Sequence, residues 1–284
     1  MINLSENIDI YIPDGAFRET ALERITHLGI GAHPDDLEIM AIDGILKCYN
    51  GKIPSFGGIT CTNGSGGVLA NQYATLSREN LKEIRKQEQK NAALVGRYSA
   101  VMQLGFNSSD IMGKSNELFE RNIKEILLST KPKVIYTHNP VDKHATHLAV
   151  LLTVVKVLRS LASEYKPQEF YGAEVWRDLD WLSDTDKIRF DVSAIPHISQ
   201  ALICVYDAQI SSGKRFDKGT LGRRFAHATF DDGYASDGTT ALAFGLDLMP
   251  LLGKPYLGVA DFVGNLIDRF KKNALSSLNQ HEIL

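Results

Sequence analysis

The feature of this sequence that most restricts its fold is the alternation of short apolar runs with longer segments of helical periodicity. We expect β-strands at the apolar runs, which occupy Ile25–Ala32, Ser55–Thr62, Ala100–Leu104, Val134–Thr137 and Phe170–Trp176. We expect helices between them, at Pro34–Tyr49, Ser77–Gly96, Leu118–Ser129 and His147–Glu164. Strands that alternate with helices of this length predict an α/β fold, with a Rossmann-like, mainly parallel sheet and helices on both faces.

The remaining residues, from about 190 to 284, follow a less regular pattern and are expected to be mostly helical. No repeat, low-complexity segment or Pro/Gly/Ser-rich linker divides the chain. We therefore expect one α/β domain over residues 1–284, in which residues 190–284 are a C-terminal extension packed on the sheet.

Composition and charge exclude several classes of protein. The chain is 44% hydrophobic and 23% charged, which is ordinary for a globular protein and excludes a disordered, collagen-like or disulfide-scaffold chain. Its 31 Lys and Arg residues face 34 Asp and Glu residues, so no excess of positive charge points to a nucleic-acid partner.

The cysteines and the apolar segments bear on location. The three cysteines, Cys48, Cys61 and Cys204, are far apart and form no CxxC pair, which is typical of reduced thiols in a cytoplasmic protein. The N-terminal residues lack the apolar core of a signal peptide, and Leu148–Leu158 is too short to span a bilayer. We expect a cytoplasmic protein with no membrane partner. The sequence is compatible with a homo-oligomer and does not determine its size.

The first group of candidate functional residues follows the first predicted strand, where the crevice of an open α/β sheet lies. The segment His33-Pro34-Asp35-Asp36 can be interpreted as an ordinary helix start, because proline and acidic residues favour the first turn. Interpretation as a dinucleotide site is weak, since Gly29-x-Gly31 lacks the third glycine and the carboxylates would repel a pyrophosphate. Alternatively, His33 and Asp36 bind one metal ion, and Asp35 takes a proton from bound water.

The second group follows the fourth predicted strand, in the segment from Thr137 to His147. His144 and His147 are three residues apart at a predicted helix start, so both can face one side. Considered alone, they would be ordinary solvated histidines. Because both groups follow strands of one sheet, we expect them to open onto the same crevice. Together they supply two histidines and one carboxylate with a fourth position open, as a catalytic zinc ion commonly requires.

The HPDD element at residues 33–36, continued by Leu37-Glu38 and followed far downstream by an NPxDxHxxH segment at residues 139–147, resembles the PIG-L/LmbE family. This family comprises zinc-dependent N-acetylglucosaminyl deacetylases, including those of GPI-anchor, mycothiol and bacillithiol synthesis. The Gly-rich loop Asn63–Gly67 and the Arg85-x-x-Glu88 pair fit the same pattern. The resemblance covers about residues 25–180.

The resemblance implies one Zn²⁺ per chain, bound by His33, Asp36 and His147. It also implies that Asp35 is the general base and that His144 stabilises the transition state. One departure concerns the second histidine pair, where Thr146 stands in place of an Asp that would orient the first histidine. Asp142 is a candidate to replace it.

Two further residues are candidates for substrate binding. The resemblance places Arg85 near the substrate, although a solvated or ion-paired arginine on a helix is the simpler interpretation. Asp110 follows the third predicted strand, from which it could hold sugar hydroxyls.

The function expected from these patterns is metal-dependent hydrolysis of a linear amide bond, by which an N-acetylated amino sugar or its glycoside loses its acetyl group. Two alternatives stay open. The same metal-bound water could hydrate a C=C bond in a small unsaturated acid, or the chain could be a metal-stabilised carbohydrate-binding protein without turnover. Asp35 argues against the binding protein, because binding alone needs no second carboxylate. Acetate release distinguishes deacetylation from both alternatives.

Overall fold

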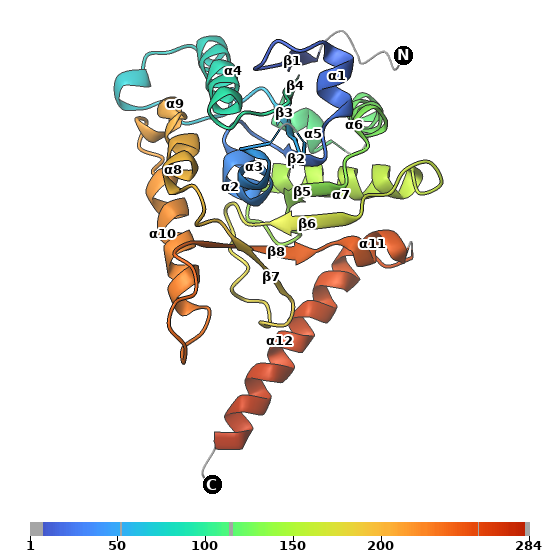
Figure 1. Ribbon diagram of the computed structural model, residues 1–284, viewed down its shortest axis with the longest axis vertical. Coiled ribbons are helices and arrows are strands. Elements are labelled where there is room, and N and C mark those ends of the chain that lie inside the picture. Colours follow the sequence, from blue (N-terminus) through green and yellow to red (C-terminus); the bar gives the residue numbers. More distant parts are fainter. Residues whose placement is uncertain (1–7, 52, 114–115, 255, 282–284) are drawn as a thin grey trace.

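The fold is built on one eight-stranded sheet, seen in a computed structural model that describes residues 8–51, 53–113, 116–254 and 256–281 (Figure 1). The strand order is β1-β4-β3-β2-β5-β6-β8-β7. The five strands β2 to β6 are parallel, whereas β1 is antiparallel to β4 and β8 is antiparallel to both of its neighbours. The strands are β1 Asp9–Tyr11, β2 His27–Gly31, β3 Phe56–Thr62, β4 Ala100–Phe106, β5 Val134–His138, β6 Glu169–Ala173, β7 Lys187–Asp191 and β8 Leu242–Asp247.

Helices cover both faces of this sheet (Figure 1). One face is covered by α1 (Arg18–Glu23), α6 (Glu117–Thr130), α7 (Ala145–Ser160) and α11 (Met249–Gly253). The other is covered by α2 (Asp36–Met40), α3 (Ile42–Cys48), α4 (Arg78–Val95) and α8 (Pro196–Cys204). The remaining helices are α5 (Ser108–Ile111), the 3-10 turn η1 (Asn71–Tyr73), α9 (Asp207–Ile210), α10 (Phe216–Phe230) and α12 (Val259–His281).

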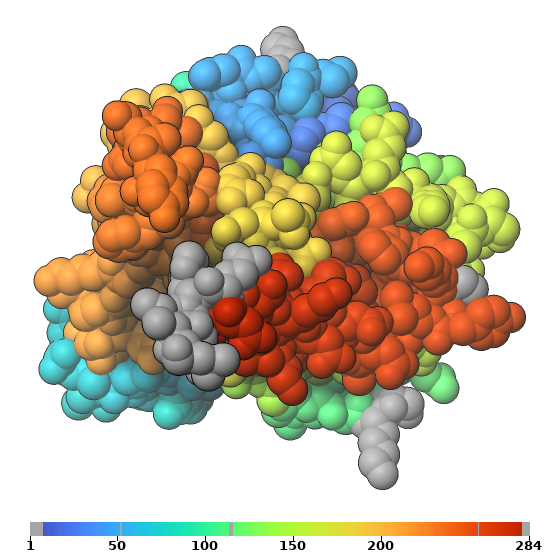
Figure 2. All heavy atoms as spheres, turned by 90° about the horizontal axis from the view of Figure 1, so that it is seen from below, coloured from blue at the N-terminus to red at the C-terminus, as the bar shows by residue number. Residues whose placement is uncertain are grey.

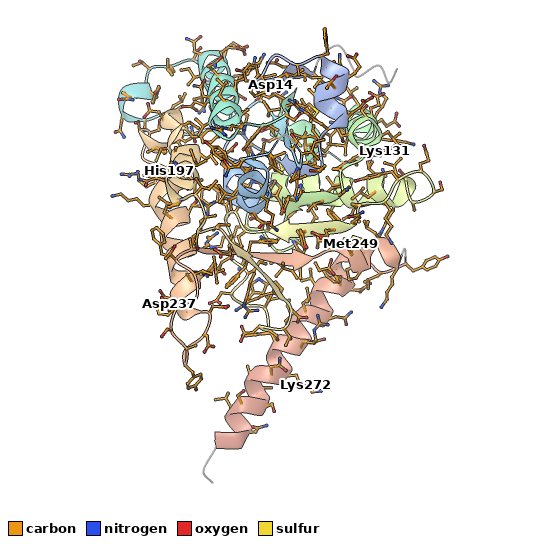
Figure 3. All side chains as sticks on the ribbon, viewed as in Figure 1. Asp14, Lys131, His197, Asp237, Met249 and Lys272 are labelled. Carbon is orange, nitrogen blue, oxygen red and sulfur yellow. The ribbon has the colours of Figure 1, made fainter. Side chains whose placement is uncertain are left out.

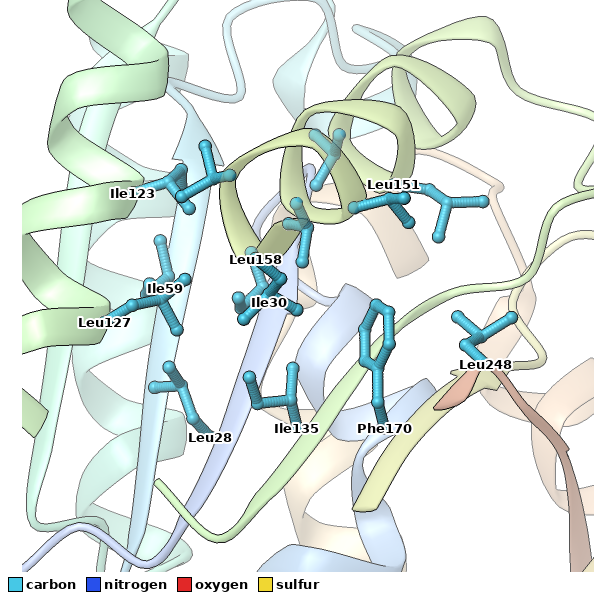
Figure 4. Close-up of a cluster of buried hydrophobic side chains, with 14 of the residues drawn as sticks. Leu28, Ile30, Ile59, Ile123, Leu127, Ile135, Leu151, Leu158, Phe170 and Leu248 are labelled. Carbon is cyan, nitrogen blue, oxygen red and sulfur yellow. The ribbon is translucent and has the colours of Figure 1, made fainter. Parts of the chain in front are cut away.

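The core on the α6 and α7 face explains why the strands are so apolar (Figure 4). Leu28 and Ile30 alternate along β2 and are fully buried, as parallel strands covered by helices require. Each such aliphatic side chain contributes roughly 1.5–3 kcal/mol when it is removed from water. The same cluster includes strand residues Ile59, Ile135 and Phe170 and helix residues Ile123, Leu127, Leu151 and Leu158. This core fixes the ends of the strands, from which the site is built.

The predicted mainly parallel sheet with helices on both faces is confirmed. The prediction of a single helix at Pro34–Tyr49 was wrong, because α2 ends at Met40 and α3 begins at Ile42. The buried Arg224 of α10 donates hydrogen bonds to the carbonyls of Glu38 and Ile39 near this break. A guanidinium from a distant helix thus binds carbonyl groups that an interrupted helix leaves free.

Three strands were not predicted. The short strand β1 pairs with β4 at one edge of the sheet, and β7 and β8 form the other edge. The expected extension at residues 190–284 therefore begins within β7 and supplies β8 to the same sheet, in addition to its helices. These strands alternate less clearly and owe their position to pairing with strands already in place.

The C-terminal helix α12 extends away from the sheet (Figures 1 and 3). Its first turns are anchored by the buried Phe262 and Leu266, whereas its second half, around Lys272, is exposed. Figure 2 shows the red residues of α12 beside the yellow residues that precede and include β7, where Arg269 pairs with Asp186 at 2.8 Å. Within the described ranges, no helix combines the length and apolar character needed to cross a lipid bilayer. Residues 1–7, the start of the segment expected not to be a signal peptide, lie outside these ranges.

Candidate active site

The turn from β2 into α2 carries His33, Asp35 and Asp36, and sends the two adjacent carboxylates to different partners. Asp35 has a φ of 101°, in the left-handed region that non-glycine residues rarely occupy outside functional sites and turns. Its carboxylate reaches Arg85, whereas Asp36 accepts a hydrogen bond from the backbone N–H of His33 at 2.6 Å. A Cβ on Gly31 would lie 3.0 Å from the Cβ of Asp36, so the glycine leaves room for this turn.

The turn from β5 into α7 brings the second pair of histidines to the same place. His147, in the first turn of α7, is fully buried, whereas His144 precedes the helix and is exposed. The ring of His144 lies edge-on to His33 with the centroids 4.7 Å apart, and it stacks on His147 at 4.9 Å. Partial desolvation of the ring and the neighbouring His33 and His147 lower the pKa of His144, which favours its neutral form.

Three donor atoms from the two turns form a nearly equilateral triangle. His33 Nδ1 lies 3.1 Å from His147 Nε2 and 3.2 Å from Asp36 Oδ2, and the third side, from His147 Nε2 to Asp36 Oδ2, is 3.3 Å. Tetrahedral zinc with bonds of about 2.0–2.1 Å requires neighbouring donors to be about 3.3 Å apart. Two imidazole nitrogens and one carboxylate oxygen are also ligand types that Zn²⁺ prefers. The residues therefore fit a single zinc ion with one position left open.

A fourth histidine, His138 at the end of β5, lies beside this triangle and had no role in our predictions. Its Nε2 is 3.5 Å from Asp36 Oδ2, and its ring stacks on His147 at 3.8 Å. However, the backbone N–H of Ala32 donates a hydrogen bond to this nitrogen at 2.9 Å, which occupies its lone pair. His138 thus fastens the end of β2 to the end of β5 and is not a free ligand. The sequence placed it at the strand end, but its partner lies on another strand.

Asp142 supports His147 and not the ring of His144. Its Oδ1 lies 3.2 Å from His147 Nδ1 and accepts the backbone N–H of His144 at 3.0 Å. Its Oδ2 accepts the backbone N–H of Trp176 at 3.0 Å. A carboxylate at the second ring nitrogen commonly orients a metal-binding histidine and fixes its tautomer. The sequence suggested Asp142 for the orientation of His144, but only the backbone of that residue contacts it.

Arg85 holds Asp35 beside this triangle of donor atoms. Its Nη2 lies 2.8 Å from Asp35 Oδ2 and also donates to the Pro34 carbonyl, while its Nη1 donates to the Gly64 carbonyl at 3.2 Å. Gly64 has a φ of +72°, and a Cβ there would lie 3.1 Å from Arg85 Cδ, so glycine is required. Burial raises the pKa of Asp35, and the Arg85 guanidinium opposes that rise. Arg85 is thus a buried ion-pair partner and not a solvated surface arginine.

These side chains face a cavity of about 490 Å³ at the carboxyl ends of the parallel strands, within the usual size range of small-molecule sites. A hollow of about 340 Å³ adjoins it and shares Asp35, Asp36, Trp176, Lys214 and Phe216 with it. The far wall comes from parts of the chain that carried no site prediction, including Gln209, Lys214 and Phe216 near α9 and α10.

The structure does not bring Asp110 to this cavity, although its neighbour Ser108 lines the wall. The carboxylate of Asp110 accepts hydrogen bonds from the side-chain amide of Asn107 at 2.9 Å and from its backbone N–H at 3.3 Å. This arrangement is a capping box at the start of α5, so the Asp110 side chain caps the N-terminus of that helix.

Comparison with known families identifies this part of the chain. Residues 28–158, which include both turns, match the PIG-L family model, described as GlcNAc-PI de-N-acetylase. These residues are thus similar to the PIG-L family over nearly half of the chain. The family match supports the expectation of a deacetylase and confirms the predicted resemblance. A search of curated protein sequences gives no match.

Solved structures share the fold of this chain beyond the residues matched by the family model. A conserved protein from Thermus thermophilus is 17% identical with a TM-score of 0.61, covering 82% of this chain and 99% of its own. N,N'-diacetylchitobiose deacetylase from Pyrococcus horikoshii is 14% identical with a TM-score of 0.60, covering 83% and 88%. The 4-carboxy-2-hydroxymuconate hydratase from Pseudomonas putida is 15% identical with a TM-score of 0.58, covering 79% and 96%. At these identities the similarity concerns the fold.

Proposed function

We propose that this protein is a zinc-dependent N-deacetylase acting on an N-acetylated amino sugar or its glycoside. The observation that carries the proposal is the triangle of His33 Nδ1, Asp36 Oδ2 and His147 Nε2 beside the separate carboxylate of Asp35. The PIG-L match supports amide hydrolysis, and the sugar substrate of the Pyrococcus deacetylase supports an amino sugar. The three cysteines are free, which fits the proposed cytoplasmic location.

A zinc ion held by the triangle would supply Lewis acidity, which polarises an acetyl carbonyl and lowers the pKa of water toward 7. Asp35, held by Arg85, accepts the proton of the attacking water and returns it to the leaving amine nitrogen. Such general acid–base catalysis typically contributes about 10²–10⁴-fold. His144 lies beside His33 at the cavity surface, from where its ring can donate a hydrogen bond to the oxygen that gains charge.

Each supporting group then has a defined task. Arg85 is a positioning residue that keeps the Asp35 carboxylate directed into the cavity. Asp142 holds the ring of His147 from behind, and His138 fixes the spacing of the two strand ends. Asp110 has no part in this mechanism.

A hydratase is the rival function, because the Pseudomonas hydratase has a similar fold. The family description favours amide hydrolysis, since its name is that of a de-N-acetylase. The two reactions leave different products: deacetylation gives acetate and a free amine, whereas hydration consumes a C=C bond and releases nothing.

The test is a product screen with purified, zinc-loaded protein. We expect acetate and primary amine to appear in equal amounts from N-acetylglucosamine conjugates, and the Asp35→Asn variant to serve as the inactive control. Loss of absorbance from an unsaturated dicarboxylic acid without acetate release would support the hydratase. Saturable sugar binding without any product would support a carbohydrate-binding protein.

A further inference from the structure

A second cavity lies at the end of the sheet opposite to the proposed active site. Its volume is about 390 Å³, and its lining includes Ser55 and Ser99, which directly precede β3 and β4. It therefore opens at the amino ends of the parallel strands, whereas the triangle of donor atoms lies at their carboxyl ends. Among the described residues, none lines both this cavity and the proposed active site, so the two are separate.

Three charged side chains line the second cavity, and two of them neutralise each other. Arg24 Nη2 pairs with Asp14, which is labelled in Figure 3, at 2.7 Å. Arg24 Nε also donates to the Ser99 hydroxyl at 2.6 Å. The third side chain is Arg97, and within the described part of the chain its guanidinium pairs with no carboxylate and donates no hydrogen bond. The second cavity therefore carries one uncompensated positive charge.

The backbone and an aromatic ring both fix the position of Arg97. Its φ of 54° belongs to the left-handed turn that ends α4. This turn is closed by hydrogen bonds from the Arg97 N–H to the Leu94 carbonyl and from the Tyr98 N–H to a carbonyl of α4. Arg97 Cζ lies 4.4 Å from the centroid of the Tyr49 ring, a favourable cation–π position. The donor groups of the guanidinium are thus held ready for an anion.

The rest of the lining suits the uncharged part of a small organic molecule. The Leu94 side chain is 48% exposed and, with the Tyr49 ring, offers apolar surface in the same cavity as the guanidinium. Covering such surface stabilises a complex. Ser55 is buried, and among the described residues only its backbone groups form hydrogen bonds, so its hydroxyl is available to a ligand.

The geometry points to a second ligand site at the amino ends of the strands, which binds a small organic anion with an apolar body and one carboxylate or phosphate group. Arg97 binds the anionic group in two parallel hydrogen bonds, as arginine does with both kinds of anion. Tyr49 and Leu94 pack against the apolar body. A volume of about 390 Å³ is within the usual range of small-molecule sites. The site does not depend on the proposed deacetylase function.

The test measures the binding of three probes that differ in one substituent: 2-naphthoate, 2-naphthyl phosphate and the neutral 2-naphthamide. Calorimetry with the purified protein should give a Kd below about 1 mM for at least one anion, and a Kd at least about tenfold higher for the amide. The naphthoate and phosphate arms distinguish a carboxylate ligand from a phosphate ligand. No saturable binding of either anion, or equal affinity for the anions and the amide, would overturn the proposal.

Arg97→Gly locates the site, because glycine suits the left-handed turn and the variant should fold. We expect the Kd of the anion to rise at least about tenfold. Lys131→Gly is the matched control, since Lys131 has a φ of 41° at the end of α6 and lies outside the cavity lining, and its Kd should match the wild type. Binding that Arg97→Gly leaves intact would overturn the proposal, because the anion would then bind elsewhere, for example at the triangle of donor atoms.

Leu94→Glu tests the same cavity from a second residue. The substitution lies at an exposed position of α4, so the fold should be kept, and the new carboxylate repels the anion and competes for Arg97. We expect the Kd of the anion to rise at least about tenfold. Gln87→Glu adds the same charge at an exposed position of α4 outside the cavity lining and should leave the Kd unchanged. Wild-type affinity in Leu94→Glu would contradict the assigned position of the ligand.

Discussion

The two walls of the cavity differ in how their residues are brought together. The chemical wall consists of the β2–α2 and β5–α7 turns, where neighbours in sequence are neighbours in space. The outer wall consists of Trp176, Lys214 and Arg223, which come from separate loops and a helix of the C-terminal region. The comparison teaches that reacting groups are set by short turns on a rigid sheet, whereas the groups that contact the rest of a substrate depend on long-range packing.

The largest effect should come from the ligands of the chemical wall. We expect His33→Ala, Asp36→Ala and His147→Ala each to lose the metal and at least about 10³-fold in kcat/KM, because zinc needs all three donors. Mass spectrometry of bound metal and the acetate assay measure both effects. His197→Ala, at an exposed position of α8 (Figure 3), is the control. A variant of the three that kept stoichiometric zinc would remove that residue from the ligand set.

Asp35→Asn distinguishes the proposed base, Asp35, from the proposed metal ligands His33 and Asp36 in the same turn. Asparagine keeps the size of the side chain and tolerates the positive φ, so the metal should stay bound. The variant cannot take a proton, and we expect kcat to fall by about 10²–10⁴-fold. Near-normal turnover with bound zinc would contradict the assignment of the base.

His144→Ala tests the contrast between the two histidines before and within α7. We expect the metal content and KM to stay close to wild type while kcat falls by about 10²–10³-fold, as for loss of one donor to a developing oxyanion. Parallel metal analysis of His147→Ala sharpens the result. If His144→Ala lost zinc and His147→Ala retained it, the roles of the two would be exchanged.

Arg224→Leu tests whether the C-terminal region supports the chemical wall. The substitution leaves the buried carbonyls of Glu38 and Ile39 without their donor, which should lower the free energy of unfolding by about 1–3 kcal/mol. Urea denaturation measures the change. Arg269→Leu, which removes an exposed ion pair on α12, should cost less than about 1 kcal/mol. Equal effects of the two would argue that α10 gives α2 no special support.

Glu88→Gln probes the contact between α4 and α9, and we expect its effect on stability to appear as a dependence on pH. Glu88 on α4 accepts the backbone N–H of Ala208 on α9 at 2.7 Å, and burial raises its pKa to about 7. Because the folded pKa exceeds the unfolded value, Glu88 favours the folded state at low pH and this contribution is lost as the pH rises toward 7.

The expected result is that wild-type stability falls relative to Glu88→Gln between about pH 4.5 and 8. A shift from 4.5 to about 7 corresponds to roughly 3 kcal/mol at most. Thermal melting of both proteins at each pH measures the difference, with Glu83→Gln, an exposed glutamate of the same helix, as control. Parallel curves for the wild type and Glu88→Gln would contradict the raised pKa.

The sequence predicts the chemical wall of the cavity better than it predicts the outer wall. The central strands were predictable because covered parallel strands are continuously apolar, and the candidate ligands because a strand end followed by HPDD or HxxH is a local pattern. His138 was within the quoted segment, but its partner Ala32 is 106 residues away and no spacing rule connects them. Lys214 gave no signal, since an unpaired cation is recognised only once its neighbours in space are known.

The interruption between α2 and α3 has a thermodynamic consequence. The helix that begins with Asp36 is only five residues long, and its last carbonyls are bound by Arg224 from a helix that starts 180 residues later. Ordering of α2 by the proposed metal ion and docking of α10 would therefore be coupled equilibria. Since coupling free energies are reciprocal, any gain in α10 docking upon metal binding must return as an equal gain in metal affinity. Amide hydrogen exchange in α10, compared with and without zinc, measures this coupling free energy.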